Sequence, residues 1–140
     1  MEVTYEELIK NAIDARKNAY TPYSKFKVGA ALLTADNQII KGCNIENASY
    51  SPVNCAERTA IFKAVSEGIM NFKAIAIVGG KDSETDEFSD YAYPCGVCRQ
   101  VMREFCAPDF EIIVGKSVEE YKVFTLSELL PQGFGPENLL

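Results

Sequence analysis

Two short segments of this sequence carry residue types that could perform hydrolytic metal chemistry. The first contains Cys55 and Glu57, and the second, further along the chain, contains Cys95 and Cys98. Because the chain has no histidine, a metal ion there must be bound by thiolates, and a proton must be carried by a carboxylate or by water. Three thiols and one carboxylate match the three ligands and the proton shuttle of a catalytic zinc site.

The spacing of the cysteines predicts how they could share one ion. Cys95 and Cys98 are three residues apart and follow Pro94, which is typical of a helix start, so their side chains should lie on one face. Cys55 should begin a second helix, and it becomes the third ligand if the two helix N-termini converge. Three thiolates leave one tetrahedral position for water, and Glu57 can lean back toward that position as the proton shuttle.

The charge of such a site needs compensation. Three thiolates around a dication leave a surplus negative charge, which opposes the ionisation of water. Each helix N-terminus presents roughly half a positive charge. Arg58 lies three residues after Cys55 and can donate hydrogen bonds to the thiolates. We therefore expect Arg58 to compensate the thiolate charge.

Other interpretations of the cysteines remain open. The five cysteines are an odd number, which favours metal ligands or buried thiols over a disulfide framework. A structural zinc could be closed by Cys43 or Cys106 as a fourth ligand. A thioredoxin-like redox pair has the same C-x-x-C spacing, but the strand that should precede it early in the chain is missing. We expect Cys43 and Cys106 to be core or loop thiols.

Composition restricts the class of protein. With 140 residues, 47% of them hydrophobic, the chain is predicted to form one domain over residues 1–140 with its own core. The net charge of -6 disfavours a nucleic-acid partner, because phosphate binding needs a basic surface. The acidic N-terminus, and the lack of an apolar run near the ~20 residues that span a bilayer, predict a cytoplasmic protein with no membrane partner.

The elements that must position these residues follow from periodicity and turn signals. The pattern predicts helices over 4–18, 55–67, 94–105 and 126–130, and strands over 26–35, 38–42, 72–79, 111–114 and 121–124. Loops are expected over 44–54 and 81–90, with a Pro/Gly-rich tail over 131–140. Together these elements predict an α/β fold, a three-layer α/β/α arrangement with a mixed five-stranded sheet.

Four segments and the tail carry a family resemblance. They read FKVGAAL from Phe26, GCNIENASYS from Gly42, NCAERTA from Asn54, PCGVCRQ from Pro94 and LLPQGFGPENL from Leu129. Over nearly its whole length the chain resembles the small, homotetrameric class of cytidine deaminases. The resemblance implies a single CMP/dCMP-type deaminase domain with that family's fold and one zinc ion per chain. The implied reaction converts cytidine and deoxycytidine to uridine and deoxyuridine plus ammonia, in pyrimidine salvage.

The resemblance also implies roles for individual residues. It makes Cys55, Cys95 and Cys98 the zinc ligands, Glu57 the general acid/base, Arg58 the thiolate partner, and Phe26, Asn44, Glu46, Ala48, Tyr50, Ala56 and Phe134 the substrate-binding residues. Asn44 and Glu46 would bind the ribose hydroxyls. Phe26 and Phe134 would form aromatic walls for the pyrimidine, Phe134 coming from a neighbouring subunit of a homotetramer with shared active sites.

Two features depart from the family pattern, and two other functions compete. Tyr93 stands where a small residue is expected, and the acidic 81–90 loop is long. A blasticidin-S-type nucleoside deaminase would have a similar three-cysteine fold, but Asn44, Glu46 and the tail argue against it. A non-catalytic structural zinc module would have no need of Glu57 or of an open fourth position.

Overall fold

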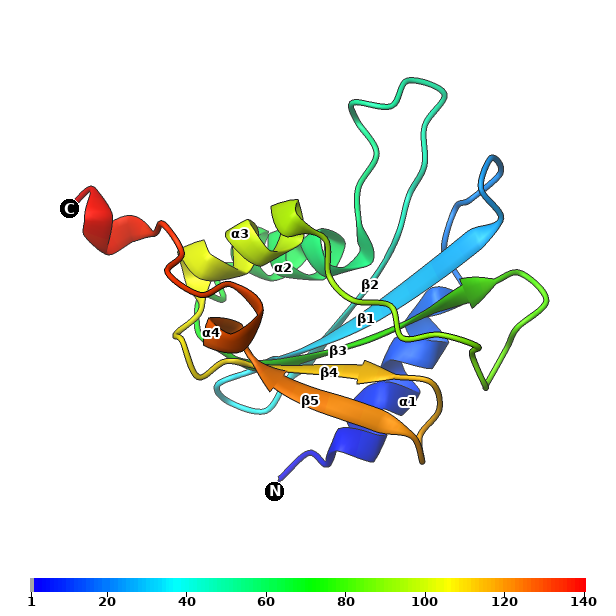
Figure 1. Cartoon of the computed structure of the whole chain (residues 1–140), viewed down its shortest axis with the longest axis horizontal. Coiled ribbons are helices and arrows are strands. Elements are labelled where there is room, and N and C mark those ends of the chain that lie inside the picture. Colours follow the sequence, from blue (N-terminus) through cyan, green and yellow to red (C-terminus); the bar gives the residue numbers. More distant parts are fainter. Residues whose placement is uncertain (1) are drawn as a thin grey trace.

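A five-stranded sheet between two layers of helices forms the core of the protein (Figure 1). The computed structural model describes residues 2–140. In spatial order the strands are β2 (Ile39–Cys43), β1 (Phe26–Thr34), β3 (Phe72–Lys81), β4 (Glu111–Gly115) and β5 (Tyr121–Thr125). Strands β3 and β4 are parallel and the other neighbours are antiparallel. The predicted α/β class with a mixed five-stranded sheet is therefore confirmed.

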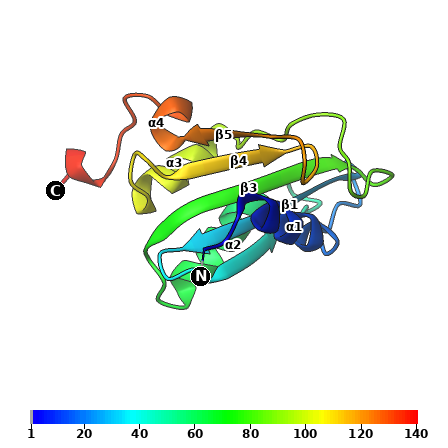
Figure 2. The ribbon, with the colours of Figure 1, turned by 90° about the horizontal axis from the view of Figure 1, so that it is seen from below.

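The helices cover the two faces of the sheet unequally. Helix α1 (Tyr5–Arg16) lies alone against one face, over β1 and β3 (Figure 2). Helices α2 (Ala56–Ser66), α3 (Gly96–Phe105) and the short α4 (Leu126–Leu129) lie on the other face. The three predicted layers are present, and both candidate metal segments belong to the α2–α3 layer.

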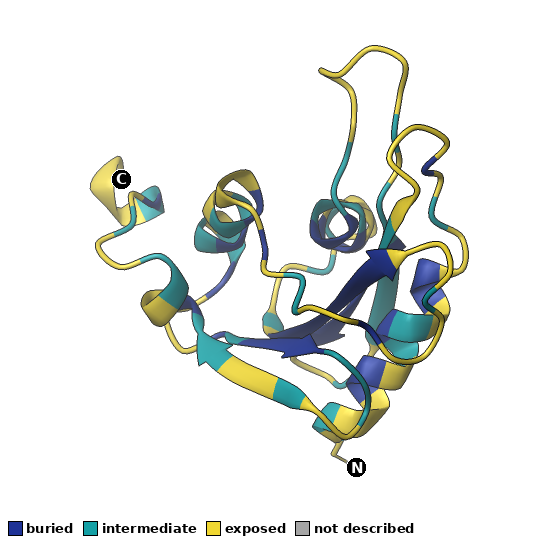
Figure 3. Cartoon of the chain, turned by 45° about the vertical axis from the view of Figure 1, so that its right-hand side comes forward, coloured by how far each residue is buried: buried dark blue, intermediate teal, exposed yellow. Residues whose placement is uncertain are grey.

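Alternating side chains of the central strands fill two separate cores. Ala31, Ala76 and Val78 pack with α1, whereas Leu32 and Ile77 pack with α2 and α3. Because both faces are covered, β1 and β3 are apolar along most of their length instead of alternating with polar residues. Figure 3 shows the consequence, a sheet centre that is buried while the loops around it are exposed.

Local signals explain where the helices begin and end. The Thr4 hydroxyl caps α1 by accepting the Glu7 N–H at 3.1 Å. Helix α1 ends at Arg16, two residues before the predicted end, and α2 is followed by Gly68 with a φ of 83°, a conformation that favours glycine. None of the helices in residues 2–140 is both long and apolar enough to cross a membrane.

Two segments project from the body of the domain. The connection from β2 to α2 extends away from the sheet, and the C-terminal tail extends past α4 (Figure 1). The tail includes a 3-10 helix, Pro136–Asn138, and contacts α3. The Gln100 side chain donates to the Phe134 carbonyl at 2.8 Å, and Arg103 forms an ion pair with Glu137. The tail is therefore anchored, although the sequence predicted no regular structure there.

Candidate active site

Three cysteines meet where α2 and α3 begin. Cys55 is the residue that precedes α2, and Cys95 is the residue that precedes α3. Cys98 follows in the first turn of α3, and the backbone N–H of Cys98 donates to the Cys95 sulfur at 3.4 Å. The three sulfur atoms all lie within 4.8 Å of one another. The two helix N-termini thus converge, which is the condition under which Cys55 can share an ion with Cys95 and Cys98.

The geometry of these sulfurs fits a zinc ion. Two sulfurs bonded to tetrahedral zinc at ~2.3 Å lie about 3.8 Å apart, and the sulfurs of Cys55 and Cys95 are separated by 3.8 Å. Cys98 is fully buried while Cys95 is exposed, so the cluster has one closed side and one open side. The donor set is the one that zinc prefers, and its open side leaves room for a fourth, non-protein ligand.

A fourth protein ligand is not in place within residues 2–140. The metal-binding group that these residues offer consists of Cys55, Cys95 and Cys98. Cys106 lies at the far end of α3 and packs in the core, and Cys43 ends β2. Burial raises the pKa of both of these thiols, that of Cys106 to about 12, so they behave as small apolar side chains. This arrangement opposes the closed structural site.

Arg58 supplies positive charge to the cluster. Its Nη2 donates to the Cys55 sulfur at 3.2 Å. A hydrogen bond from the Cys98 thiol, together with Arg58, lowers the pKa of Cys55 to about 5 despite its burial. Among the described side chains, the Arg58 Nε is a buried donor without a hydrogen-bond partner. Arg58 therefore has donor capacity left for a second negatively charged group, which a cluster of three ionised thiolates would provide.

Glu57 is a buried carboxylic acid beside the cluster. Its side chain is 4% exposed, in the first turn of α2. Burial raises its pKa to about 7, because a desolvated carboxylate loses the hydration that stabilises its charge. Glu57 is not one of the clustered ligands. A buried acid that is not bound to a metal is free to exchange protons with a bound molecule.

A cavity of about 490 Å³ opens in front of the thiols and Glu57. Its lining combines apolar walls with a few polar side chains, as substrate sites do, and consists of Phe26, Val28, Asn44, Ile45, Glu46, Val53, Asn54, Cys55, Ala56, Glu57, Ile77, Ala92, Tyr93 and Cys95. The structure therefore brings Phe26, Asn44, Glu46 and Ala56 to the cavity that contains the thiols. Tyr93, the unusual residue before Pro94, is part of the wall.

Asn44 and Glu46 hold the rim of this cavity together. The Asn44 side chain accepts from the Val28 N–H at 2.8 Å and donates to the Phe26 carbonyl at 3.0 Å. Glu46 accepts from the Tyr23 N–H at 3.0 Å and from the hydroxyl and N–H of Ser24, and the Ser24 hydroxyl is the main cause of its lowered pKa. An amide has a second N–H and a carboxylate has further lone pairs, so both can still bind a ligand.

Three residues implied by the resemblance lie outside the cavity of the single chain. Ala48 and Tyr50 are on the projecting connection, where Tyr50 is 87% exposed, and Phe134 on the tail is 58% exposed. Conversely, Val28 and Ala92 line the cavity although sequence reasoning did not select them. Val28 could have been found from its spacing, because residues two apart on a strand share a face with Phe26.

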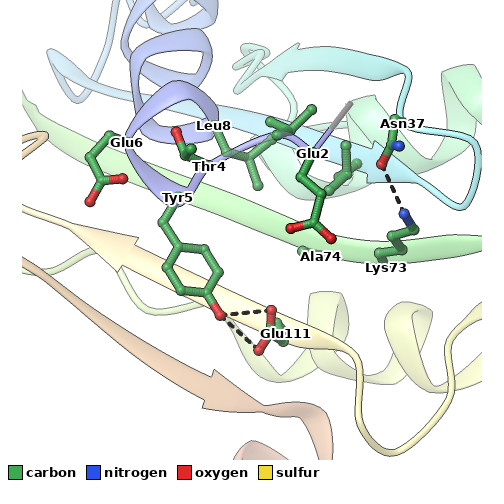
Figure 4. Close-up of a pocket in the computed structure, with 11 residues that line it drawn as sticks. Glu2, Thr4, Tyr5, Glu6, Leu8, Asn37, Lys73, Ala74 and Glu111 are labelled. Atoms are coloured by element: carbon green, nitrogen blue, oxygen red, sulfur yellow. Dashed lines mark hydrogen bonds between the residues drawn. The ribbon is translucent and has the colours of Figure 1, made fainter.

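A second cavity, of about 400 Å³, lies at the start of α1 (Figure 4). Two pairs of its polar side chains bond to each other. The Tyr5 hydroxyl contacts both carboxylate oxygens of Glu111, at 2.9 and 2.8 Å, and Lys73 donates to Asn37 at 2.8 Å. None of the clustered cysteines lines it. The thiols and the buried acid therefore belong to the cavity between β1, the start of α2 and the segment that precedes α3.

Comparison with known proteins identifies the family of the chain. Residues 2–114 match the family model described as the cytidine and deoxycytidylate deaminase zinc-binding region. A cytidine deaminase from Halalkalibacterium halodurans is 50% identical over 132 residues, which cover 94% of this chain and 95% of that protein. The crystal structure of a cytidine deaminase from Burkholderia pseudomallei superposes with a TM-score of 0.84 at 46% identity, covering 94% of this chain and all of that one.

The competing nucleoside deaminase is a more distant relative. A blasticidin-S deaminase from Bacillus cereus is 35% identical over 109 residues, which cover 77% of this chain and 76% of that protein. Both its identity and its coverage are lower than those of the cytidine deaminase from Halalkalibacterium halodurans.

Proposed function

This chain belongs to the family of cytidine and deoxycytidylate deaminases, and on that premise we propose that Cys55, Cys95, Cys98 and Glu57 form its active site. The protein is a hydrolase that carries out zinc-dependent deamination of cytidine. Water replaces the exocyclic amine of the pyrimidine, and ammonia leaves. Deoxycytidine, which lacks one hydroxyl of the same sugar, is proposed as a second substrate.

One observation carries this assignment of the site. The sulfurs of Cys55 and Cys95 line the same cavity as the carboxyl group of Glu57, and the three clustered sulfurs have the spacing of a zinc site with an open position. A zinc ion bound there supplies a Lewis acid that makes water a nucleophile near neutral pH. A structural zinc would require neither the cavity nor the buried acid.

Glu57 is proposed to move the protons of the reaction. Its carboxyl group takes a proton from the attacking water and delivers a proton to N3, the ring nitrogen next to the carbon that bears the amine. It then takes the second proton of that water from the hydroxyl group formed on the same carbon and passes it to the amine, so that the C–N bond breaks, ammonia leaves and the carbonyl group of the product forms. Proton transfer by a positioned side chain of this kind contributes roughly 10²–10⁴-fold to a rate. Arg58 holds the thiolates and keeps their charge from opposing the reaction.

The sugar is proposed to lie against Asn44 and Glu46. Both side chains line the cavity next to the thiols and keep unused hydrogen-bonding capacity. Phe26 and Ala56 line the same cavity, and a flat apolar ring is a suitable surface for a pyrimidine. The base would then face the thiols and Glu57 while the ribose faces the rim.

Replacing Glu46 with glutamine should raise the Michaelis constant for cytidine about tenfold, because a neutral amide accepts a weaker hydrogen bond from a sugar hydroxyl than a carboxylate does. The control is dideoxycytidine, which has no 2′- or 3′-hydroxyl. Its Michaelis constant should be the same for the native and variant proteins. An equal increase of the Michaelis constant for cytidine and for dideoxycytidine would mean that Glu46 supports the fold of the rim and does not contact the sugar.

A homotetramer with shared active sites is proposed from the position of the tail. Phe134 is exposed and lies outside the cavity of its own chain, yet Gln100 and Arg103 hold the tail on α3. An anchored, exposed aromatic residue suits a contact with another subunit. Ala48 and Tyr50 on the projecting connection are proposed to lie in the same interface. A cytoplasmic location and a single deaminase domain over residues 1–140 remain part of the proposal.

Deleting residues 132–140 should raise the Michaelis constant for cytidine at least about tenfold, if Phe134 closes a neighbour's pocket. Zinc content should not change, because the ligands lie on α2 and α3. Steady-state kinetics, elemental analysis and sedimentation measure the three quantities. The matched control is Leu139→Ala in the full-length chain, an exposed residue of the same tail, which should leave all three unchanged. A truncated monomer with native affinity for cytidine would rule out shared sites.

The direct test of the function is the loss of near-ultraviolet absorbance when the purified, zinc-loaded protein is incubated with cytidine. Cytidine turnover that exceeds turnover of blasticidin S supports the proposal. Preference for blasticidin S would favour the antibiotic deaminase. A fully zinc-loaded protein that is inactive on cytidine, deoxycytidine and blasticidin S would be a structural zinc module.

A further inference from the structure

Arg16 is a buried cation outside the active site. It is the last residue of α1, and its side chain is packed inside the protein with the residue 5% exposed. Its guanidinium donates three hydrogen bonds to main-chain carbonyls: Nε to Lys27 at 3.0 Å, and Nη2 to Gly80 at 2.9 Å and to Lys81 at 2.6 Å. A buried charge is costly unless its surroundings satisfy it, so this position needs an explanation.

The three carbonyls come from the ends of two neighbouring strands. In the antiparallel pair of β1 and β3, Lys27 lies opposite Gly80 and Phe26 lies opposite Lys81. Carbonyl oxygens that converge at a strand end repel one another unless a donor lies between them. A guanidinium presents several N–H groups in a rigid, planar fork, whereas an ammonium group is a point charge on a flexible stem. Arg16 thus joins the two strand ends by geometry as well as by charge.

The 81–90 loop completes the environment of Arg16. The guanidinium lies over the ring of Phe88, with 4.8 Å between its carbon and the ring centroid, which favours a cation. Burial lowers the pKa of Arg16, and the carboxylates of Asp82 and Glu84 act in the opposite direction. Phe88 is 5% exposed, and Glu84 accepts hydrogen bonds from Ser89. The acidic loop is therefore an ordered support for the cation.

The strand ends held by Arg16 are also the wall of the active-site cavity. Phe26 and Val28, the two neighbours of Lys27, both line that cavity, and Asn44 bonds to the main chain of both. Gly79 lies beneath them with no room for a side chain, since a Cβ there would come within 2.9 Å of Ala92, 3.1 Å of Val28 and 3.2 Å of Phe26. A small change in the separation of β1 and β3 would therefore displace the wall.

We propose that Arg16 is a positioning residue for the nucleoside, because it fixes the ends of β1 and β3 at the separation that places Phe26 and Asn44 against the substrate. The inference rests on the proposed contacts of Phe26 and Asn44 with the nucleoside. Arg16 itself touches neither substrate nor metal ligand. It lies on the α1 face of the sheet, whereas the thiols and Glu57 belong to α2 and α3.

The position of Arg16 predicts a particular kinetic effect. Loss of the Arg16 guanidinium group should weaken binding of the nucleoside, because the cavity wall at Phe26 and Val28 and the rim at Asn44 would shift. The turnover number should change less, since Glu57 and the three cysteines are held by other helices. We expect Arg16→Met to raise both the Michaelis constant for cytidine and the inhibition constant of the product uridine about tenfold or more.

The experiment compares Arg16→Met and Arg16→Lys with the native protein at a temperature where all are folded. Zinc content should remain native in both. Arg16→Lys keeps the charge but not the fork, so its Michaelis constant should lie between those of the native and Met proteins. If Arg16→Met does not fold, Arg16→Lys decides the question. The proposal would be overturned if the Michaelis constant for cytidine and the inhibition constant of uridine stayed within about twofold of the native values in Arg16→Met, or in Arg16→Lys if Arg16→Met does not fold. Arg16 would then have a structural role only.

Two further variants separate the possible causes. Ile9→Val removes a buried methyl group from α1 where it contacts Gly115, away from the cavity, and should lower stability without changing the Michaelis constant. If Ile9→Val raised the Michaelis constant for cytidine as much as Arg16→Met does, the effect would be due to a general loss of stability and the proposal would be overturned.

Phe26→Ala tests the proposed site. If it leaves cytidine binding unchanged, the placement of the substrate is wrong and the inference falls with it. If it weakens binding while the Arg16 variants do not, only the inference fails.

Discussion

Replacing Glu57 with glutamine is expected to yield a folded, zinc-loaded protein whose turnover of cytidine is lower by at least about 10²–10⁴-fold, the contribution typical of a general acid–base residue. The effect should appear mainly in the turnover number. Binding of cytidine and uridine should change much less, because the substitution preserves the size of the side chain. Elemental analysis measures the zinc content, and single-turnover kinetics on the same preparation measure the rate of the chemical step.

The structure explains why metal and activity should separate in this variant. Glu57 lines the cavity but does not belong to the cysteine cluster that could hold zinc. Glutamine has the same shape and retains a carbonyl oxygen and an amide group, but it cannot take up and release a proton at neutral pH. The pocket would therefore still assemble around the substrate, and only the proton transfers would be lost.

Glu67→Gln is the matched control for this prediction. Glu67 is the residue that follows the last turn of the same helix, α2, and it is exposed to solvent. The same change in charge there should leave turnover at the native level. Near-native activity of a zinc-loaded Glu57→Gln protein would exclude Glu57 as the proton carrier, and another group or water would have to take its place.

The helices could be predicted from sequence because their ends carry local signals. Thr4 caps α1 and Gly68 follows α2 in a conformation that favours glycine. Pro94 indicated the start of α3 to within two residues, because the sequence predicted the helix from Pro94 and it begins at Gly96, after Cys95. These signals act within one turn of the chain, so no knowledge of the rest of the fold is needed to read them.

Strand β3 shows where local signals fail. The sequence predicted its end at Gly79, but the strand continues to Lys81. Glycine has a low preference for strands, so Gly79 and Gly80 are typical of a strand end. In the structure Gly79 pairs with Val28 and Gly80 pairs with Lys27. The absence of side chains is used there for close packing under the cavity wall and against Phe88, which depends on distant residues.

The candidate metal ligands were accessible to sequence reasoning for a physical reason. Cys95 and Cys98 are neighbours in one helical turn, so their spacing alone predicts a shared face. Cys55, the third candidate ligand, depended on the convergence of two helices, which places its sulfur within 4.8 Å of the other two. Tyr93, just before Pro94, departs from the small residue that the family resemblance leads one to expect. Its place in the cavity wall depends on the fold and could not be predicted.

Contacts between side chains and distant main-chain groups could not be predicted. Arg16, at the end of a helix, has the sequence context of a solvated cation, but it is buried and bonds to three carbonyls. Gln100 on α3 likewise fits a solvated helix face, but its side chain donates to the main-chain carbonyl of Phe134 in the tail. Such contacts involve acceptors that every residue possesses, so they leave no pattern of residue types in the sequence.

Replacing any one of Cys55, Cys95 or Cys98 with alanine is expected to reduce zinc from one ion per chain to nearly none and to abolish turnover of cytidine. A site with three protein ligands that loses one keeps only two, and the remaining thiolates no longer enclose a tetrahedral ion. The measurement is elemental analysis after dialysis against a weak chelator, with activity measured on the same samples.

Cys43→Ala and Cys106→Ala are the controls, and both should retain zinc and activity. Neither thiol belongs to the cluster, and Cys106 packs in the core, so its replacement should lower the melting temperature but not the zinc content. If Cys43 or Cys106 proved necessary for zinc, the ion would have four sulfur ligands and no open position. Water could then not be activated at the metal, and the buried carboxyl group of Glu57 would have no catalytic role. The stoichiometry of zinc in these five variants therefore decides between a catalytic and a structural centre without reference to any substrate.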